Sequence, residues 1–193
     1  MKQIHVQVAE EFGSNARSVL GEINDIQLRA AVSFLMSANN VHILGIGHSG
    51  FFGKVLSMKL NHVGLSAYTV YNETNPPIRS GDVFVAISQS GETRTIISLV
   101  EEARSVGAKV LGITANEHSK IGQMSDVCLR VGKRAKDMEF PAMSILGNGK
   151  FENMNGALFG ASIYALFYAI VIMIMQERGE TVESVDARHA NLQ

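Results

Sequence analysis

Ser88-Gln89-Ser90-Gly91-Glu92-Thr93 is the stretch that decides the fold class. Before it, residues 82–87 form an apolar run short enough to be a buried strand, and after it residues 94–107 carry apolar side chains at helical spacing. The stretch is therefore predicted to be a strand-to-helix turn, where a helix N-terminus presents backbone N–H groups and the positive end of its dipole. Three hydroxyl side chains, together with a glycine that lets a ligand approach the backbone, favour an anion site over an ordinary helix cap. Phosphate is the usual ligand of such a site.

The composition predicts a single folded domain with a sizeable core. The 193 residues are 46% hydrophobic and 18% charged, and the formal net charge is −1. Neither a surplus of Lys and Arg nor a basic cluster favours nucleic acid as a partner. The single cysteine, Cys128, cannot form an internal disulfide, and a lone buried thiol is typical of proteins in the reducing cytoplasm.

Residues 153–176 carry no charged side chain and are apolar over a length that could cross a bilayer. The segment begins with polar residues, and no second segment of this kind occurs in the sequence. A helix that is apolar all round can also be buried in a core or in an oligomer interface. We therefore expect this helix to cover a sheet and not to enter a membrane.

Short apolar runs alternate with helical patterns along the middle of the chain. The predicted strands are residues 41–46, 67–71, 82–88, 108–114 and 127–131, and the predicted helices between them are 51–64, 93–106 and 119–124. This alternation predicts βαβ units, whose right-handed crossovers place helices on both faces of a parallel sheet. The expected fold is a three-layer α/β/α sandwich with a five-stranded parallel sheet, flavodoxin-like or Rossmann-like.

The flanking segments are expected to complete one domain over the whole chain. Its parts are an N-terminal helical hairpin at 1–38, a sheet core at 41–131 and C-terminal helices at 151–193. Asn24 is an N-cap candidate for the second helix, and Thr181 is one for the last helix. Residues 133–150 lack a clear period and are expected to form a long loop, and such loops in compact domains are usually functional or disordered.

A second glycine-rich turn, Gly45-x-Gly47-x-x-Gly50, also follows a strand and opens a helix. This is the setting of the dinucleotide-binding fingerprint, and Glu73 follows the second strand, near where an acid that binds ribose is expected. A nicotinamide-dependent oxidoreductase is therefore an open alternative. Two features favour a sugar phosphate instead. Ser49 adds a hydroxyl donor suited to a small anion, and the turn at residues 88–93 has no part in the dinucleotide scheme.

The GxGxSG turn, followed about forty residues later by SxSGET, resembles the sugar isomerase, or SIS, domain. Further segments resemble the 6-phospho-3-hexuloisomerases within that group, namely residues 51–64, 73–78, 151–152 and 187–192. The resemblance covers nearly the full length, and the terminal His189-Ala190-Asn191-Leu192 is its most family-specific part. The sequence departs from the family at residues 145–152, where the family usually has a run similar to Pro-Met-Gly-Ser-Leu-Phe-Glu and this chain has ILGNGKFE.

The resemblance implies an isomerase that interconverts D-arabino-hex-3-ulose 6-phosphate and fructose 6-phosphate, a step of the ribulose monophosphate pathway, through a cis-enediol. A carboxylate or an imidazole would move the proton and hydrogen-bond donors would stabilise the enediolate, so neither a cofactor nor a metal is required. The histidines of the sequence lack the close spacing typical of a zinc site. A phosphosugar-binding regulatory module is the alternative from a non-enzyme class.

Glu152 is the candidate base, because a carboxylate between a loop and an apolar helix would be partly desolvated and its pKa raised. The alternative is a carboxylate favourably placed at a helix N-terminus. His62 and His189 are catalytic candidates only by resemblance, for ring opening or hydrogen bonds to the sugar, and each could instead be structural. The expected contacts to the phosphate and the rest of the substrate are Gly47, Ser49, Ser88, Gln89, Ser90, Gly91, Glu92 and Thr93. The resemblance also implies a homotetramer, or at least a dimer, with the site near a subunit boundary, where His189 could act in a neighbouring subunit.

Overall fold

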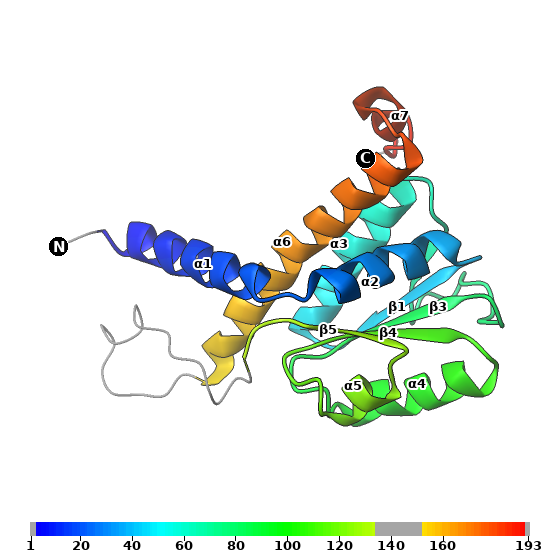
Figure 1. Ribbon diagram of the computed structural model, residues 1–193, viewed down its shortest axis with the longest axis horizontal. Coiled ribbons are helices and arrows are strands. Elements are labelled where there is room, and N and C mark those ends of the chain that lie inside the picture. Colours follow the sequence, from blue (N-terminus) through cyan, green and yellow to red (C-terminus); the bar gives the residue numbers. More distant parts are fainter. Residues whose placement is uncertain (1–2, 134–151, 192–193) are drawn as a thin grey trace.

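A five-stranded, all-parallel sheet forms the centre of the molecule (Figure 1). The computed structural model describes residues 3–133 and 152–191, apart from the side chains of residues 152–155. The strands are β1 (Val41–Gly45), β2 (Ala67–Thr69), β3 (Val83–Ile87), β4 (Lys109–Thr114) and β5 (Val127–Arg130), in the order β2-β1-β3-β4-β5. The predicted number and direction of the strands are confirmed, with ends that differ by one or two residues.

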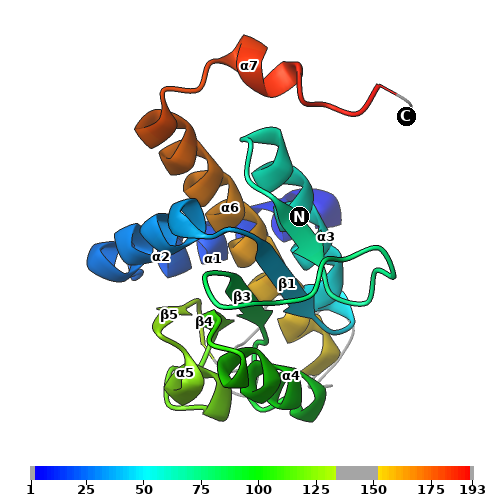
Figure 2. The same ribbon diagram turned by 90° about the vertical axis from the view of Figure 1, so that its right-hand side faces the viewer.

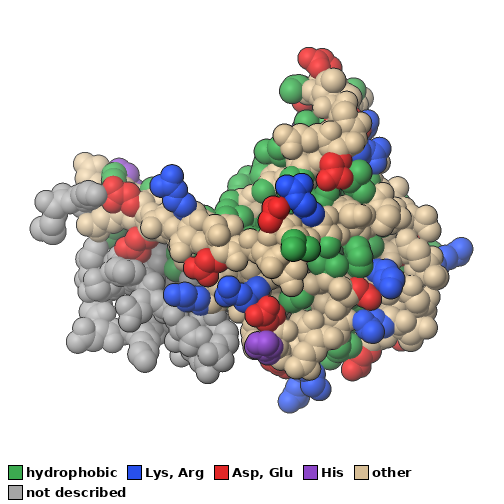
Figure 3. Space-filling view, viewed as in Figure 1, with side chains coloured by type: hydrophobic (Ala, Val, Ile, Leu, Met, Phe, Trp, Pro, Cys, Tyr) green, Lys and Arg blue, Asp and Glu red, His purple; other side chains and the backbone are tan. Residues whose placement is uncertain are grey.

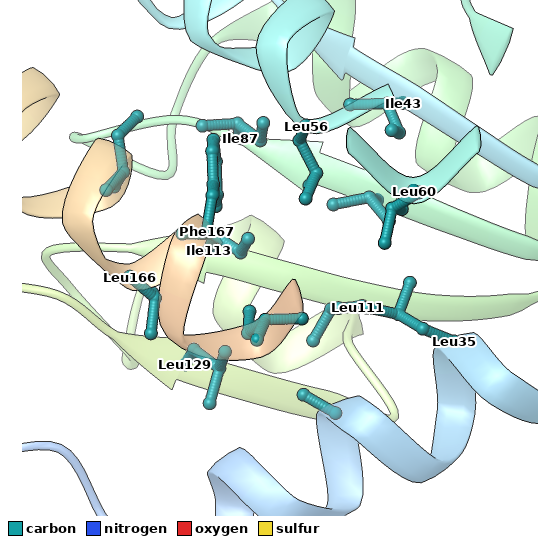
Figure 4. Packing of buried hydrophobic residues seen from close by; sticks show 14 of the residues in the cluster. Leu35, Ile43, Leu56, Leu60, Ile87, Leu111, Ile113, Leu129, Leu166 and Phe167 are labelled. Atoms are coloured by element: carbon teal, nitrogen blue, oxygen red, sulfur yellow. The ribbon is translucent and has the colours of Figure 1, made fainter. Parts of the chain in front are cut away.

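Alternate residues of β1, β3 and β4 enter two separate apolar layers, as the twofold repeat of a strand requires. One layer joins the sheet to α1 (Ile4–Gly21), α2 (Asp25–Ser37), α3 (His48–His62) and α6 (Glu152–Arg178). Figure 4 shows its centre, where side chains of α2, α3 and α6, among them Leu35, Leu60 and Phe167, point toward Ile87, Leu111, Ile113 and Leu129 of the sheet. The opposite face is covered by α4 (Arg94–Ser105) and α5 (Lys120–Met124). The three-layer sandwich is therefore confirmed.

Several element boundaries follow from capping side chains near the ends of the helices. The Asn24 side chain accepts a hydrogen bond from the Gln27 amide at 3.1 Å, so the N-cap prediction for α2 is confirmed. Thr181 begins α7 (Val182–Asp186) with a capping box that pairs it with Ser184. These caps are local, and this is why they can be recognised from the sequence.

The two predicted N-terminal helices are confirmed as α1 and α2. Among the described residues, the main packing partner of α1 is α6, whereas α2 packs on β5 and α6. The expected hairpin of the two helices remains a prediction, because the main contacts of each are with other elements.

Helix α6 covers the sheet with one face and presents the other to solvent. Leu166, Phe167, Ile170 and Ile174 are fully buried, whereas Tyr164, Tyr168 and Ile172 are 36–51% exposed. The segment Gly156–Arg178 is long and apolar enough to cross a membrane, but just over half of its most apolar stretch is buried inside the protein. Burial against the core accounts for the apolar character of only one side of this helix.

Helices α3 and α6 run side by side in the same direction. At their beginnings, His48 of α3 contacts the Gly156 carbonyl of α6, and beyond the end of α3 Gly64 lies beside the Arg178 side chain. Helix α7 stands beyond this second end, away from the sheet layers (Figure 2). Acidic and basic side chains are interspersed on the face shown in Figure 3, which agrees with the net charge near zero.

Candidate active site

The turns that follow β1 and β3 meet at the point where the strand order reverses. After β1 the chain continues to β2 on one side of this point, and after β3 it continues to β4 on the other. The helices that follow the two turns, α3 and α4, therefore lie on opposite faces of the sheet. Open α/β sheets bind ligands in the crevice that such a reversal leaves at the carboxyl ends of the strands. A cavity of about 240 Å³ occupies this position, and we call it the switch-point cavity. Its walls are Ile46, Ser49, Ile87, Ser88, Gln89, Ser90, Thr93 and Ile96.

The hydroxyl groups of the second turn hold one another in place. The Ser88 and Thr93 hydroxyl oxygens lie 3.0 Å apart, and the Gly91 amide donates to Ser88 Oγ at 3.1 Å. The Glu92 amide donates to Ser90 Oγ at 3.2 Å. A hydroxyl that accepts a hydrogen bond keeps its own proton to donate. The turn is therefore arranged so that Ser90, and one of Ser88 and Thr93, can donate to an anion.

Helices α3 and α4 both begin at this cavity without a capping side chain. The N-cap residues are Gly47, which has no side chain to offer, and Thr93, whose hydroxyl bonds Ser88 instead. The first amide groups of a helix have no partner within the helix. Two helix N-termini and several hydroxyls thus converge on one small space, which is the chemistry of a phosphate site.

Gly91 and Glu92 have supporting positions and do not line the switch-point cavity. Gly91 has a φ of 69°, and a Cβ there would lie 1.8 Å from Ser119 Oγ, so only glycine fits. Glu92 Oε1 accepts a hydrogen bond from the Lys120 amide at 3.0 Å. Both residues attach the turn to α5. Gly47, another predicted contact, lines a neighbouring cavity that also includes Glu73.

The N-terminal part of α6 lies on the first turn of α3. His48 Nδ1 is 3.1 Å from the Gly156 carbonyl oxygen, and the His48 and Phe52 rings are 5.0 Å apart. A Cβ on Gly160 would lie 2.5 Å from the Phe52 ring, so glycine allows this close approach. Glu152, one helical turn before Gly156, is the first residue of α6, and its side chain is outside the described part of the chain.

Sequence analysis did not identify His48, Gly156 or Gly160 as the residues that position α6. The signal was available, because two glycines four residues apart lie on one side of a helix and let another element approach closely. The neighbouring sequence does not reveal which element such a glycine pair contacts. Here the partner lies more than a hundred residues earlier in the chain.

His62 and His189 form a pair at the other end of α3. Their ring centroids are 3.9 Å apart, and His62 is only 8% exposed. The pKa of His62 is lowered, first by burial and then by the positive charges of His189 and Lys59. Within the described part of the chain, His62 Nδ1 is buried and has no hydrogen-bond partner. This histidine pair therefore holds a largely neutral imidazole next to a more exposed one.

Arg188, which is ion-paired with Glu180, attaches the C-terminal segment to this end of α3. The Arg188 guanidinium donates to the His62 carbonyl at 3.1 Å and to both Glu180 carboxylate oxygens at 2.9 and 3.1 Å. Hydrogen bonds from Arg188 and then from Ser184 lower the pKa of Glu180 to about 2. The attachment thus stays charged over the whole physiological pH range.

In a single chain the histidine pair is remote from the switch-point cavity. From His48 to His62 helix α3 extends for about 21 Å, at about 1.5 Å per residue. The predicted phosphate contacts and the predicted catalytic histidines are therefore at opposite ends of one helix. Among the described residues, no group of three or more His, Cys, Asp or Glu side chains could hold a metal ion.

Comparison with known proteins identifies the family of this arrangement. The model of the SIS domain matches residues 34–148, which is more than half of the chain and includes both turns of the switch-point cavity. This chain belongs to the SIS family. The SIS assignment agrees with the parallel five-stranded sheet and with the resemblance drawn from the two turns.

Individual relatives extend the similarity beyond the SIS match. The 3-hexulose-6-phosphate isomerase of Bacillus subtilis is 29% identical over 161 residues, which cover 82% of this chain and 83% of the relative. A solved structure described as a hypothetical protein aligns with a TM-score of 0.86 at 26% identity, covering 98% of this chain and 97% of that chain. A protein of Methanococcus jannaschii, for which the function of a 3-hexulose-6-phosphate isomerase has been inferred, aligns with a TM-score of 0.71 at 20% identity, covering 88% and 87%. These similarities extend over most of the chain, beyond the residues that the SIS model matches.

Proposed function

We propose that this SIS protein interconverts D-arabino-hex-3-ulose 6-phosphate and fructose 6-phosphate, without a cofactor or metal. The observation that carries the proposal is the meeting of two hydroxyl-bearing turns and two uncapped helix N-termini at the switch-point cavity. A cavity of about 240 Å³ suits a phosphate group and leaves the sugar to extend beyond it. Relatives named 3-hexulose-6-phosphate isomerase support the choice of substrate.

The proposed reaction moves a carbonyl from C3 to C2 through a cis-enediol. A base removes the proton from C2, the electron pair of that C–H bond forms a C2–C3 double bond, and the C3 carbonyl oxygen becomes an enediolate oxygen. The base, now protonated, returns a proton to C3, while the O2 proton passes to O3, so that O2 becomes the new carbonyl oxygen and O3 becomes a hydroxyl. Glu152 is the proposed base. In support, α6 begins at Glu152, and the following turn of the helix is held against His48 beside the cavity.

We propose further that the histidine pair acts in the site of another subunit. The distance along α3 separates it from the switch-point cavity of its own chain. His62 Nδ1 is buried without a partner among the described residues, and a buried polar atom of this kind gains from a partner supplied by assembly. The exposed stripe of Tyr164, Tyr168 and Ile172 on α6 is the proposed subunit contact in a homotetramer or dimer. We also propose a single domain over residues 1–193 and a location in the cytoplasm.

A coupled assay tests this function directly. The protein is supplied with D-arabino-hex-3-ulose 6-phosphate, and fructose 6-phosphate is measured by its further enzymatic conversion. Arabinose 5-phosphate and sedoheptulose 7-phosphate serve as alternative substrates in parallel assays. Turnover of the hexulose phosphate supports the proposal, and turnover of another sugar phosphate alone corrects the substrate. Tight binding of sugar phosphates without any turnover would instead identify a regulatory binding module.

A further inference from the structure

A second cavity lies beside the switch-point cavity, on the side of β2. It has a volume of about 640 Å³ and is lined by β1, β2, the first turns of α3 and the loop that follows β2. The turn at residues 45–50 separates the two cavities, because Gly47 and Gly50 face this one while Ser49 faces the other. We call it the β2 cavity. Its size lies within the range of pockets that hold drug-sized ligands, about 300–1,000 Å³.

Two strongly exposed aromatic side chains line the β2 cavity. Phe51 is 69% exposed and Tyr71 is 64% exposed. Tyr71 has a φ of 71°, a left-handed conformation that side-chain-bearing residues rarely adopt and that is enriched at ligand sites. Lys54 lies over the Phe51 ring, with its Nζ 6.0 Å from the ring centroid. Exposed aromatic rings beside a cation provide stacking surfaces for a planar base and a charge for a phosphate.

The three glycines of the GxGxxG turn have the roles that a nucleotide-binding turn requires. A Cβ on Gly45 would lie 2.6 Å from the Ser49 backbone, and a Cβ on Gly50 would lie 2.8 Å from the Gly45 carbonyl oxygen. These two glycines therefore allow close packing of helix on strand. Gly47, with a φ of 59°, has no atom within 4 Å of its missing side chain, so a ligand can approach its backbone.

A carboxylate completes the pattern at the place where ribose binding needs one. Glu73 follows β2 and lines the same cavity as Gly47 and Lys54. In nucleotide-binding sheets, an acid just beyond the second strand accepts hydrogen bonds from ribose hydroxyls. The hydroxyl-rich turn at residues 88–93 lines only the other cavity. The chemistry of the β2 cavity is therefore different from that of a sugar-phosphate site.

We propose that the β2 cavity binds a purine nucleoside phosphate, separately from the sugar phosphate. Phe51 and Tyr71 stack on the base, Glu73 binds the ribose hydroxyls, and Lys54 pairs with the phosphate. Because the two cavities share the turn at residues 45–50, the nucleotide is a candidate regulator of sugar-phosphate binding and not a reactant.

Equilibrium dialysis with labelled AMP, ADP and ATP on the full chain tests the site. Adenosine and ribose 5-phosphate are the matched partial ligands, since one lacks the phosphate and the other lacks the base. We expect a nucleotide to bind at one site per chain, and Phe51→Ala and Glu73→Gln to weaken that binding at least fivefold each. Ser90→Ala, in the switch-point cavity, should leave nucleotide binding unchanged, and Ile26→Ala, an exposed residue on α2, is the surface control.

Three results would overturn the proposal. They are the absence of nucleotide binding at millimolar concentration, binding that is lost in Ser90→Ala but kept in Phe51→Ala, and a change of oligomeric state in Phe51→Ala. The last result would mean that the aromatic side chains form a subunit contact. The isomerase assay is independent, because hexulose phosphate turnover can succeed or fail whatever the nucleotide result. Both variants change exposed side chains, so thermal melting should stay close to the parent and shows whether each variant is folded.

Discussion

The two ends of helix α3 are built from opposite kinds of chemistry. At its beginning, hydroxyl side chains and two helix N-termini surround the switch-point cavity, and none of the residues that line it carries an ionisable side chain. At its end, two imidazoles and the Arg188–Glu180 ion pair meet. One end is suited to hold an anion at any pH, and the other to exchange protons. The proposed binding residues and the proposed catalytic histidines, predicted as one site, therefore lie apart in a single chain. The proposed reaction needs either Glu152 or a second subunit to bring binding and proton transfer together.

The largest expected effect comes from removing the proposed base at the binding end. Glu152→Gln keeps the shape of the side chain, so the KM should change little, whereas kcat should fall by about 10²–10⁴, the usual contribution of a positioned general base. Glu177→Gln, at the other end of the same helix, is the matched control. Near-normal turnover of Glu152→Gln in the coupled assay would leave Glu152 as a helix-terminal carboxylate and make the histidines the better candidates.

Removing one hydroxyl at the binding end should weaken affinity and spare the chemistry. Ser90→Ala deletes a donor to a charged group, which costs about 1–3 kcal/mol and corresponds to a KM rise of about 5- to 150-fold. Inhibition by inorganic phosphate should weaken in parallel. Ser105→Ala, at the far end of α4, is the control, because its hydroxyl donates to the Glu102 carbonyl of its own helix. An unchanged KM and unchanged phosphate inhibition would contradict the phosphate assignment.

Charging the exposed stripe on α6 should separate the subunits if it is their contact. Ile172, which is 51% exposed, is replaced by Arg, and Ile26→Arg on α2, where the side chain is 79% exposed, is the control. Light scattering should show the parent and the control as oligomers and Ile172→Arg as a smaller species. Activity per chain should fall with the dissociated fraction. If Ile172→Arg remains an oligomer, the subunit contact does not lie at this stripe.

Mixed oligomers show whether the two ends of α3 meet across a subunit boundary. Glu152→Gln and His189→Ala should each have little activity alone. When equal amounts of the two variants are mixed at random, half of the dimers contain one chain of each variant. Each such hybrid dimer has one of its two sites intact, so about a quarter of the parent activity should return. Dissociation and reassociation of the parent under the same conditions is the control. Without recovery, the histidine pair has no part in a neighbouring site.

The smallest expected effect is a pH dependence of stability at the histidine end. The pKa of His62 is lower in the folded protein than its usual value of 6.5, so on acidification the unfolded chain takes up a proton that the folded chain resists. The free energy of unfolding should therefore fall as the pH drops from 7 through 6.5. Glu180, with a pKa of about 2, remains charged down to far lower pH and adds nothing in this window.

Urea unfolding between pH 5 and pH 8 measures this effect. The pH dependence should become weaker in His62→Gln and stay the same in His118→Gln, whose imidazole is largely exposed. An identical pH dependence in the parent and in His62→Gln would show that the buried imidazole does not control the stability of this end.

Features that depend on near neighbours in sequence were predictable. Apolar runs of strand length, the caps at Asn24 and Thr181, and the two glycine turns each depend on a few consecutive residues. The alternation of strands and helices then determined a parallel sheet with helices on both faces, because right-handed crossovers leave few other topologies. The prediction that the two turns bind an anion rests on the same local chemistry.

Only the tertiary structure decided which of these features meet. The strand order places the turns after β1 and β3 next to each other, and Gly91 must be glycine because Ser119, from another loop, lies against it. Helix α6, far along the chain, provides the main packing surface for α1, a contact that the local pattern of α1 does not reveal. Burial, and then the positive charge of His189 from far along the chain, contribute most to the lowered pKa of His62. Local sequence determines conformation within a few residues, whereas contacts between distant residues depend on how whole elements pack. The packing of these elements decides which of the predicted site residues lie together.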